Sequence, residues 1–227
     1  MTAFAAKILL AALTLLPMAA CGGGTTTDEV SYTIDQSVTA LVVDARAASV
    51  AIDAGDGPVT VTEKHRYSDA KPATARRVDG GTLQLTESGC GKDNVRCETE
   101  FRVRIPSATT AQITAHAGAV KVHGLAGDVH VTTEAGAVEG TGLSGDTVVV
   151  KTQAGATSLE FTEAPSTLQA TTEVGAVEVH VPGAAAYAVE VDTDVGKSTV
   201  TVRKDPASPH RIRISTQVGA VSIEAQP

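Results

Sequence analysis

The stretch His116-Ala117-Gly118-Ala119-Val120 is the first copy of a short signature that decides the fold of this chain. The signature joins a glycine to small apolar neighbours, and it returns at intervals of about 20 residues. The later copies are Glu134-Ala135-Gly136-Ala137-Val138, Gln153-Ala154-Gly155-Ala156-Thr157, Glu173-Val174-Gly175-Ala176-Val177, Asp194-Val195-Gly196-Lys197-Ser198 and Gln217-Val218-Gly219-Ala220-Val221. A repeat of this length is typical of proteins built by stacking one small structural unit.

Apolar and polar residues alternate on both sides of each signature glycine. The positions five and three residues before it, and two and four residues after it, hold mainly Val, Ile, Leu, Ala and Thr, as in Ile113, Ala115, Val120 and Val122. The positions between them form two polar registers: His116, Glu134, Gln153, Glu173, Asp194 and Gln217, and Lys121, Glu139, Ser158, Glu178, Thr199 and Ser222. Alternation with a period of two predicts a strand, a bend and a second strand, with the polar side chains outward.

Each repeat is therefore expected to be one coil of a stack, closed by a turn such as 124–128 or Pro182-Gly183-Ala184. A single coil cannot bury its apolar face, whereas stacked coils pair their backbones and bury continuous columns. The sequence predicts an all-β fold, a single-stranded, β-helix-like β-solenoid with about two short strands per coil of roughly 20 residues. Aromatic residues make up 3% of the chain and Trp is absent, which suits a thin core of β-branched side chains.

Residues 30–105 show the same alternation less regularly. Short apolar runs occur at 40–44, 48–52, 59–62, 82–85 and 101–106. We expect irregular N-terminal β coils and a cap with a disulfide loop over 30–105, and regular solenoid repeats over 106–227. The segment from Lys64 to Cys97 is the expected excursion from the stack. Atypical terminal units are needed because a regular exposed edge invites pairing with another chain.

The first 20 residues predict export. Lys7 precedes an apolar run over residues 8–16 that is too short to span a bilayer. Ala19 and Ala20 lie directly before Cys21 and resemble a lipobox, in which the cysteine is lipidated; an ordinary signal peptide cleaved after Ala20 is the alternative. We expect a lipoprotein signal peptide over 1–20 and a lipidated, flexible tether over 21–29. The predicted location is the cell membrane, lipid-anchored and facing outside the cytoplasm.

The chain has three cysteines. Lipidation of Cys21 leaves Cys90 and Cys97, and export favours their oxidation. We expect a local disulfide between Cys90 and Cys97 that staples a hairpin loop. A metal or redox pair is the alternative, but the spacing is not C-x-x-C and no further ligands lie nearby in the sequence.

Several of these motifs in series resemble one family. They are the pattern Val-x-Ile-x-x-Gly-Asp-Gly over 50–57, Asp79-Gly80-Gly81 before a strand, Ile105-Pro106 at the end of a charged strand, and the recurrent Gly-Ala-Val coils. Over roughly residues 38–225 the chain is similar to the DUF4097 family, an adhesin domain of bacterial surface proteins. The resemblance implies a β-helical fold and a non-enzymatic surface role, and it supplies no catalytic residues.

The sequence predicts no catalytic, cofactor or metal site. His116, His123 and His130 are spaced by seven, but the strand pattern separates them, which favours surface polar residues over a zinc site. Glu134, Glu173 and Asp194 share one outer register, as in glycan-cleaving β-helices, with Gln153 between the first two. The segment Asp53–Gly57 lacks the later glutamate of a calcium loop, so it is interpreted as a turn.

The function expected from the sequence is binding at the cell surface. A net charge of −8 without a cluster of Lys and Arg excludes a nucleic-acid partner. Our first hypothesis is a lipid-anchored surface interaction protein, an adhesin or scaffold that binds an unidentified envelope protein, peptide or glycan. The second is an envelope-stress sensory or regulatory lipoprotein that binds a peptide, an antibiotic or a membrane protein. A glycan-active β-helix enzyme is a third.

Overall fold

The computed structural model describes residues 24–89 and 97–226, which form 18 strands and no helix. None of these residues therefore supplies an apolar helix that could cross a membrane. The strands are β1 (Thr26–Ile34), β2 (Ala40–Ala54), β3 (Val59–Tyr67), β4 (Thr74–Asp79), β5 (Thr82–Glu87), β6 (Cys97–Ile105), β7 (Thr110–Ala117), β8 (Val120–His123), β9 (Val129–Ala135), β10 (Val138–Leu143), β11 (Thr147–Ala154), β12 (Thr157–Phe161), β13 (Thr167–Val174), β14 (Val177–Pro182), β15 (Ala188–Val195), β16 (Ser198–Val200), β17 (Arg211–Val218) and β18 (Val221–Gln226).

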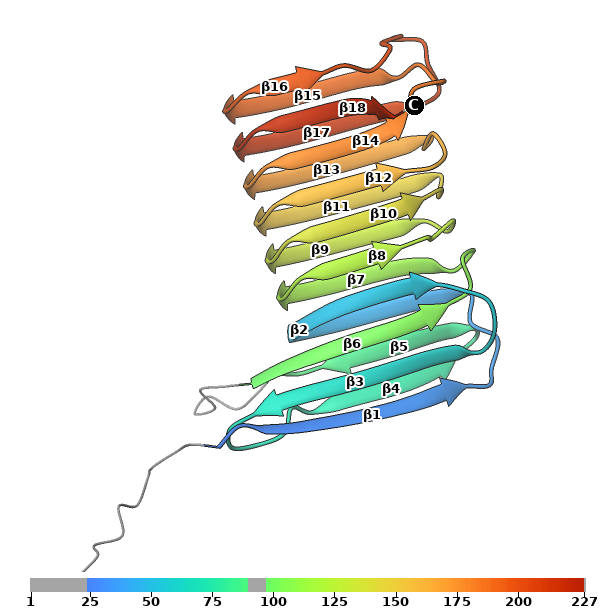
Figure 1. Cartoon of the computed structure of the whole chain (residues 1–227), viewed down its shortest axis with the longest axis vertical. Coiled ribbons are helices and arrows are strands. Elements are labelled where there is room, and N and C mark those ends of the chain that lie inside the picture. Colours follow the sequence, from blue (N-terminus) through green and yellow to red (C-terminus); the bar gives the residue numbers. More distant parts are fainter. Residues whose placement is uncertain (1–23, 90–96, 227) are drawn as a thin grey trace, which may run out of the picture.

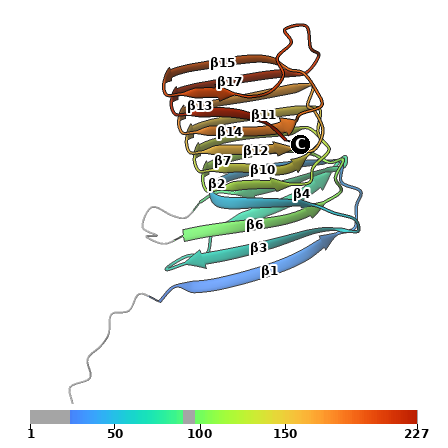
Figure 2. The ribbon, with the colours of Figure 1, turned by 45° about the horizontal axis from the view of Figure 1, so that its top comes forward.

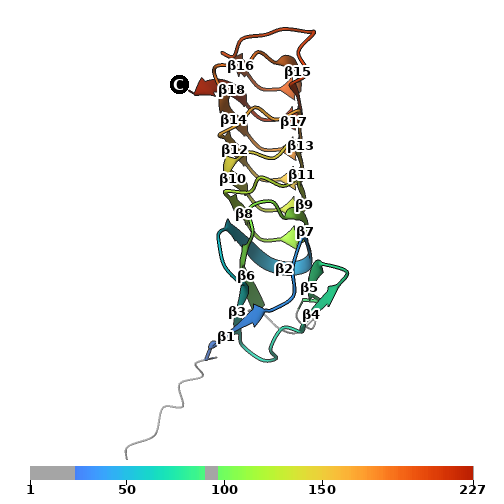
Figure 3. The same cartoon turned by 90° about the vertical axis from the view of Figure 1, so that its right-hand side faces the viewer.

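The strands form an elongated stack with two facing sheets (Figures 1 and 3). One sheet has the order β1-β3-β6-β2-β8-β10-β12-β14-β18-β16. The other has the order β4-β5-β2-β7-β9-β11-β13-β17-β15. We call them sheet A and sheet B. From β5 and β6 onward every pairing is parallel, so each coil places one strand in each sheet, and the predicted two-strand solenoid coil is confirmed.

The interior columns are the ones that the alternation predicts. Five residues before the signature glycine, Ile113, Val131, Val150, Ala170 and Ile214 are each at most 1% exposed. The threonines three residues before it are also buried, at 133, 152, 172 and 216. All six members of the first polar register, from His116 to Gln217, are exposed. Burial of these columns from coil to coil supplies the core that no single coil could form.

The signature glycines lie at the bend between the two sheets, where successive coils touch. A Cβ on Gly155 would overlap the carbonyl oxygen of Gly136, and a Cβ on Gly175 would overlap that of Gly155. The coils are spaced at about 4.8 Å by their backbone hydrogen bonds. A side chain at this corner would therefore force the coils apart, which explains why the repeat is built on glycine.

The last two coils are exchanged in space. Strands β17 and β18 insert between β13–β14 and β15–β16, so the C-terminus lies one coil below the end of the stack (Figure 1). The outermost coil is β15–β16, and Figure 2 shows β15 at the end of sheet B. The repeat pattern alone does not predict this exchange, because both coils carry the same signature.

The N-terminal part departs from the regular stack. Strand β2 crosses from sheet B, where it pairs with β5, to sheet A, where it pairs with β6. Strands β1, β3 and β4 join through antiparallel pairings and form the end opposite to β15–β16. The hairpin loop expected at Cys90–Cys97 lies largely outside the described residues; the strands before and after it, β5 and β6, pair with β2 in different sheets.

Candidate functional site

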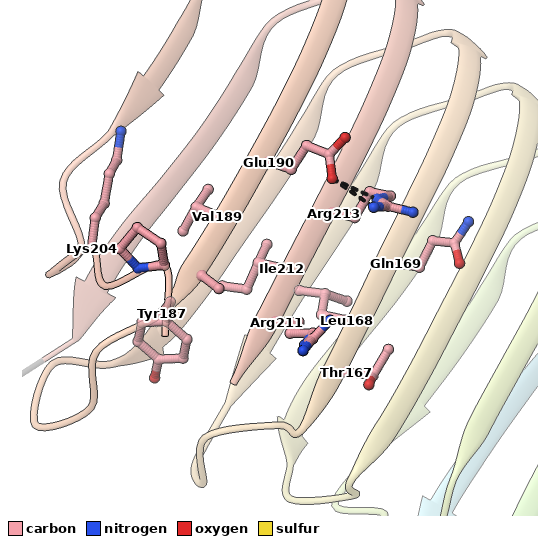
Figure 4. Close-up of a pocket in the computed structure, with 12 residues that line it drawn as sticks. Thr167, Leu168, Gln169, Tyr187, Val189, Glu190, Lys204, Arg211, Ile212 and Arg213 are labelled. Carbon is pink, nitrogen blue, oxygen red and sulfur yellow. Dashed lines mark hydrogen bonds and ion pairs between the residues drawn. The ribbon is translucent and has the colours of Figure 1, made fainter. Parts of the chain in front are cut away.

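A pocket of about 480 Å³ lies near the outermost coil, on the side of sheet B (Figure 4). We call the coil β15–β16, the loops 183–187 and 201–210 and the pocket residues of β13 and β17 the distal end. The pocket extends from the beginnings of β13, β17 and β15 to the loop 201–210. Thr167 and Gln169 of β13, Arg211 and Arg213 of β17, and Glu190 of β15 line it with Lys204 and Pro206.

Loop 201–210 is held in place by hydrogen bonds to loop 183–187. The Ser208 hydroxyl donates to the carbonyl of Ala186 at 2.7 Å, and the Arg203 guanidinium donates to that of Ala184 at 2.7 Å. Tyr187 has no exposed surface, and its hydroxyl donates to the carbonyl of Pro182 at 2.8 Å. Burial raises the pKa of the Tyr187 phenol. The wall of the pocket is thus preformed, because both loops are already anchored.

The pocket carries excess positive charge in an acidic protein. Lys204, Arg211 and Arg213 line it with one carboxylate, that of Glu190. Arg213 donates from Nε at 2.9 Å and from Nη2 at 2.7 Å to the same oxygen of Glu190. In Figure 4 the Lys204 ammonium group points away from Arg211, so the two remaining positive charges lie at different parts of the pocket wall.

The opposite end of the stack, which we call the base, holds a buried polar cluster. Glu63 and His65 of β3 are 4% and 0% exposed. The carboxylate of Glu63 accepts hydrogen bonds from the Tyr32 hydroxyl of β1 and from the Thr74 hydroxyl of β4, both at 2.6 Å. Because β3 belongs to sheet A and β4 to sheet B, this carboxylate links the two sheets.

Burial at the base shifts the pKa values of His65 and Tyr32. His65 Nε2 lies 3.5 Å from a Glu63 oxygen, and Nδ1 lies 3.2 Å from the hydroxyl of Thr99. Desolvation lowers the pKa of His65, and the positive charge of Lys71 adds to this effect. Desolvation and the hydrogen bond to Glu63 raise the pKa of Tyr32. The Arg76 guanidinium lies 3.9 Å from the centre of the Tyr32 ring and covers it.

Comparison with known proteins places the chain in a family. The model of the family described as "Toastrack DUF4097" matches residues 47–224. The chain belongs to the Toastrack DUF4097 family. No curated protein matches the chain.

Solved structures agree on the fold of this Toastrack chain. A "putative cell adhesion protein" from Clostridium sporogenes is 14% identical and matches with a TM-score of 0.57 over 88% of this chain and 100% of its own. A "putative adhesin" from Bacteroides fragilis is 13% identical, with a TM-score of 0.51 over 88% of this chain and 97% of its own. At these identities the likeness shows a shared fold. The predicted membership of DUF4097 is confirmed by the family model.

The histidines singled out in the sequence do not meet in the Toastrack stack. His116 bonds the carboxylate of Glu134 at 2.9 Å, and His123 bonds the hydroxyl of Thr141 at 2.9 Å. His130 is exposed on sheet B. No group of three or more His, Cys, Asp or Glu that could hold a metal ion occurs within 24–89 and 97–226.

The predicted outer carboxylates lie apart as well. Glu134, Glu173 and Asp194 are exposed on β9, β13 and β15, with β11 between the first two strands and β17 between the last two. At about 4.8 Å per coil, neighbouring carboxylates of this register are roughly 10 Å apart. The segment 55–58 is an irregular connection from β2 to β3, which confirms the turn predicted at Asp53–Gly57.

The predicted modification sites are only partly described. Cys21 and Cys90 lie outside the described residues, whereas Cys97 begins β6 opposite Tyr67. Lipidation of Cys21 and the Cys90–Cys97 disulfide therefore stay predictions.

Neither the base cluster nor the distal pocket was predicted from the sequence. The alternation in β3 carried a signal for the base, because Glu63 and His65 continue the inward register of Val59 and Val61. Polar residues at inward positions indicate a buried polar cluster. The pocket had no comparable signal, since it depends on the exchange of the last two coils.

Proposed function

We propose that this Toastrack protein is a lipid-anchored cell-surface interaction protein, an adhesin or scaffold without catalysis, which binds an envelope or extracellular partner at its distal end. The observation that carries the proposal is the placement of the two ends. The first described strand, β1, lies at the base, whereas the preformed pocket lies near the opposite end of the stack. A tether from Cys21 to β1 would hold the base near the membrane and the pocket away from it.

The chemistry of the two ends supports this orientation. At the base, the buried carboxylate of Glu63 already accepts hydrogen bonds from Tyr32 and Thr74, so this cluster is engaged within the protein. The pocket presents cationic side chains and an anchored loop wall. A preformed concave site with a few convergent polar groups is the usual form of a binding site. The descriptions of the structural relatives as adhesins agree with a binding role.

Two measurements on the full chain in its host test the proposal. Mass spectrometry of the membrane fraction should find an acylated N-terminal Cys21, and a mature chain with an unmodified Cys21 would refute the anchor. Capture of envelope components should weaken at least about fivefold in an Arg211→Glu variant, because a positive charge in the pocket is reversed. The control is Arg77→Glu on β4, a side chain 70% exposed at the base. Equal loss in both variants would refute binding at the distal end.

A further inference from the structure

The distal end finishes in two strands that each lack a neighbour on one side. Among the described strands, β15 pairs only with β17, and β16 pairs only with β18. Such a strand carries a row of backbone N–H and C=O groups that can hydrogen-bond another extended chain. The longer of the two edges is β15, with eight residues.

The direction of the backbone hydrogen bonds shows which groups of β15 are available. The Ala188 N–H donates to the carbonyl of His210 at 2.8 Å, on the side of β17. The N–H and C=O of Tyr187 bond Arg203 and Asp205 on the opposite side. Backbone groups alternate in direction along a strand, so those of Val189, Val191 and Thr193 also point away from β17.

A short segment of the chain, residues 203–205, pairs with the beginning of this edge but does not continue along it. Residues 203–205 bond both backbone groups of Tyr187 and form a single parallel bridge, Tyr187 to Lys204. From there the chain turns at 206–207 and returns into β17. Tyr187, directly before β15, is therefore covered by an extended segment. The Val195 carbonyl accepts from the Gly219 N–H at 2.9 Å, so the edge available for one more strand is residues 189–193.

The side chains along the edge fit an added strand with apolar residues. Val191 occupies the same interior column as Val150 and Ile214, which are 1% and 0% exposed, yet Val191 is only partly buried. Val189 in β15 and Val200 in β16 are partly buried in the same way. Another strand laid on β15 would cover the apolar side chains that the stack leaves half-open.

The outward side chains of β15 define the charge of the partner. Glu190, Asp192 and Asp194 follow each other at alternate positions and are exposed. Arg213 pairs with Glu190, whereas Asp192 lies opposite Ser215 and no described residue forms an ion pair with either aspartate. A second copy of the chain on this edge would place like charges opposite each other, which is destabilising. A strand with Lys or Arg at its outward positions would be attracted.

We propose that the free edge of β15 binds an extended polypeptide segment of alternating apolar and basic residues, which adds to sheet B as a further strand. The inference rests on the proposed function, in that it adds a second contact to the distal end: the edge of β15 holds a basic segment of the partner, whereas the cationic pocket at Arg211 holds a group of opposite charge. Backbone hydrogen bonds to residues 189–193 hold the segment, its apolar side chains cover Val189 and Val191, and its basic side chains face Asp192 and Asp194. This mode of recognition combines main-chain affinity with side-chain selection at every second position.

Synthetic peptides test the inference on the full chain in mild detergent. The probe alternates Val with Lys over about nine residues, long enough to cover one strand. One control has the same composition with apolar and basic residues in separate blocks. A second is N-methylated at alternate residues, which removes the hydrogen bonds of one edge. We expect calorimetry to detect the alternating probe with at least about tenfold higher affinity than either control. Equal affinity of the N-methylated peptide, or no binding of the probe, would overturn strand addition.

A pair of variants with the same charge change separates the edge from general attraction. Reversal of Asp192 and Asp194 to Lys should weaken probe binding roughly tenfold. The matched control reverses Glu134 and Glu173 to Lys, exposed residues of the same outer face on strands that have neighbours on both sides. Equal weakening in the control would show non-specific attraction and refute the site.

A Val191→Pro variant tests the edge backbone directly. Proline removes one outward N–H and leaves the ladder to β17 intact, as is tolerated on edge strands. It should lose most of the probe binding while circular dichroism stays that of the wild type. Retained binding contradicts the inference. If this variant misfolds, the N-methylated peptide gives the same test from the partner's side. If envelope capture still depends on Arg211 while the probe fails to bind, only the edge is refuted and the proposed function stands.

Discussion

The two ends of this Toastrack stack differ in how their outermost strands are arranged. At each end, strands lack a neighbour on one side, and the interior lacks the next coil that would cover it. At the base, β1, β3 and β4 extend the two sheets through antiparallel pairings, and hydrogen bonds from Tyr32 and Thr74 to Glu63 link the sheets. At the distal end, Val189, Val191 and Val200 stay half-buried, and residues 203–205 pair only with Tyr187, directly before β15.

The difference indicates which end is structural and which is available for binding. A buried polar cluster with nearly all its groups bonded is costly to disturb, because each group that loses its partner keeps the penalty of desolvation. Half-buried apolar side chains beside free backbone groups have the opposite property, since an added strand would improve both. The comparison therefore predicts that equal substitutions have larger effects on stability within the stack and at the base than at the distal end.

Substitution of the signature glycine should give the largest difference. Gly155→Ala places a Cβ against the carbonyl of Gly136, and β11 is held between β9 and β13. We expect a loss of about 4 kcal/mol in the free energy of unfolding, or failure to fold. Gly196→Ala meets the carbonyl of Gly219 in the same manner, but its coil has no neighbour beyond it and can move outward. We expect a loss of about 1 to 2 kcal/mol, mainly from the backbone conformation.

Denaturant unfolding followed by circular dichroism measures both glycine variants. Gly57→Ala is the matched control, because that glycine also has a positive φ, of 101°, but a Cβ there would meet nothing within 4 Å. It should resemble Gly196→Ala. Equal losses for Gly155→Ala and Gly196→Ala would contradict the picture of a distal coil that is free to adjust.

Removal of a carboxylate should separate the ends by a smaller amount. Glu63→Ala leaves the hydroxyls of Tyr32 and Thr74 buried without their acceptor, and we expect it to lower the free energy of unfolding by about 3 kcal/mol. Glu190→Ala at the distal end removes an exposed ion pair with Arg213 and should cost less than about 1 kcal/mol. The two chemical denaturation curves provide the measurement, and similar midpoints would refute a structural role of the base cluster.

Most of the stack could be predicted from the sequence because its determinants are local and repeated. Period-two alternation around each glycine assigned residues such as Ile113, Val150 and Thr172 to the interior, and all three are buried. The signature also located the bend, because neighbouring coils approach each other too closely at this corner to accommodate a Cβ. Each such prediction needed only the residues of one coil. Because the coils stack in parallel and in register, the same positions are buried in the next coil.

The two candidate sites depend on contacts between distant segments. Glu63 meets Tyr32 across 31 residues, and the antiparallel pairing that brings them together is specific to the base. The distal pocket exists because β17 lies between β13 and β15, and the matching columns of Ile214 and Val191 are compatible with either order of the last two coils. Period and composition describe a coil well, but they do not state which coil ends the stack.

Lowering the pH should destabilise the base of the stack through protonation of His65. This is the smallest of the expected effects. Desolvation lowers the pKa of His65 in the folded chain, so below the unfolded value of about 6.5 the unfolded chain binds a proton that the folded chain rejects. The stability from the neutral imidazole is complete above that pH and is lost as the pH falls toward the folded pKa. Glu63 and Asp28 oppose the shift, whereas Lys71 favours it. Denaturant unfolding between pH 7.5 and 5, from about 1 unit above to about 1.5 units below the unfolded pKa, should therefore show a steeper loss of stability for the wild type than for His65→Gln. His130→Gln, which alters an exposed histidine in β9, should follow the wild type. Parallel curves for the wild type and His65→Gln would mean that the base does not respond to protonation of this residue.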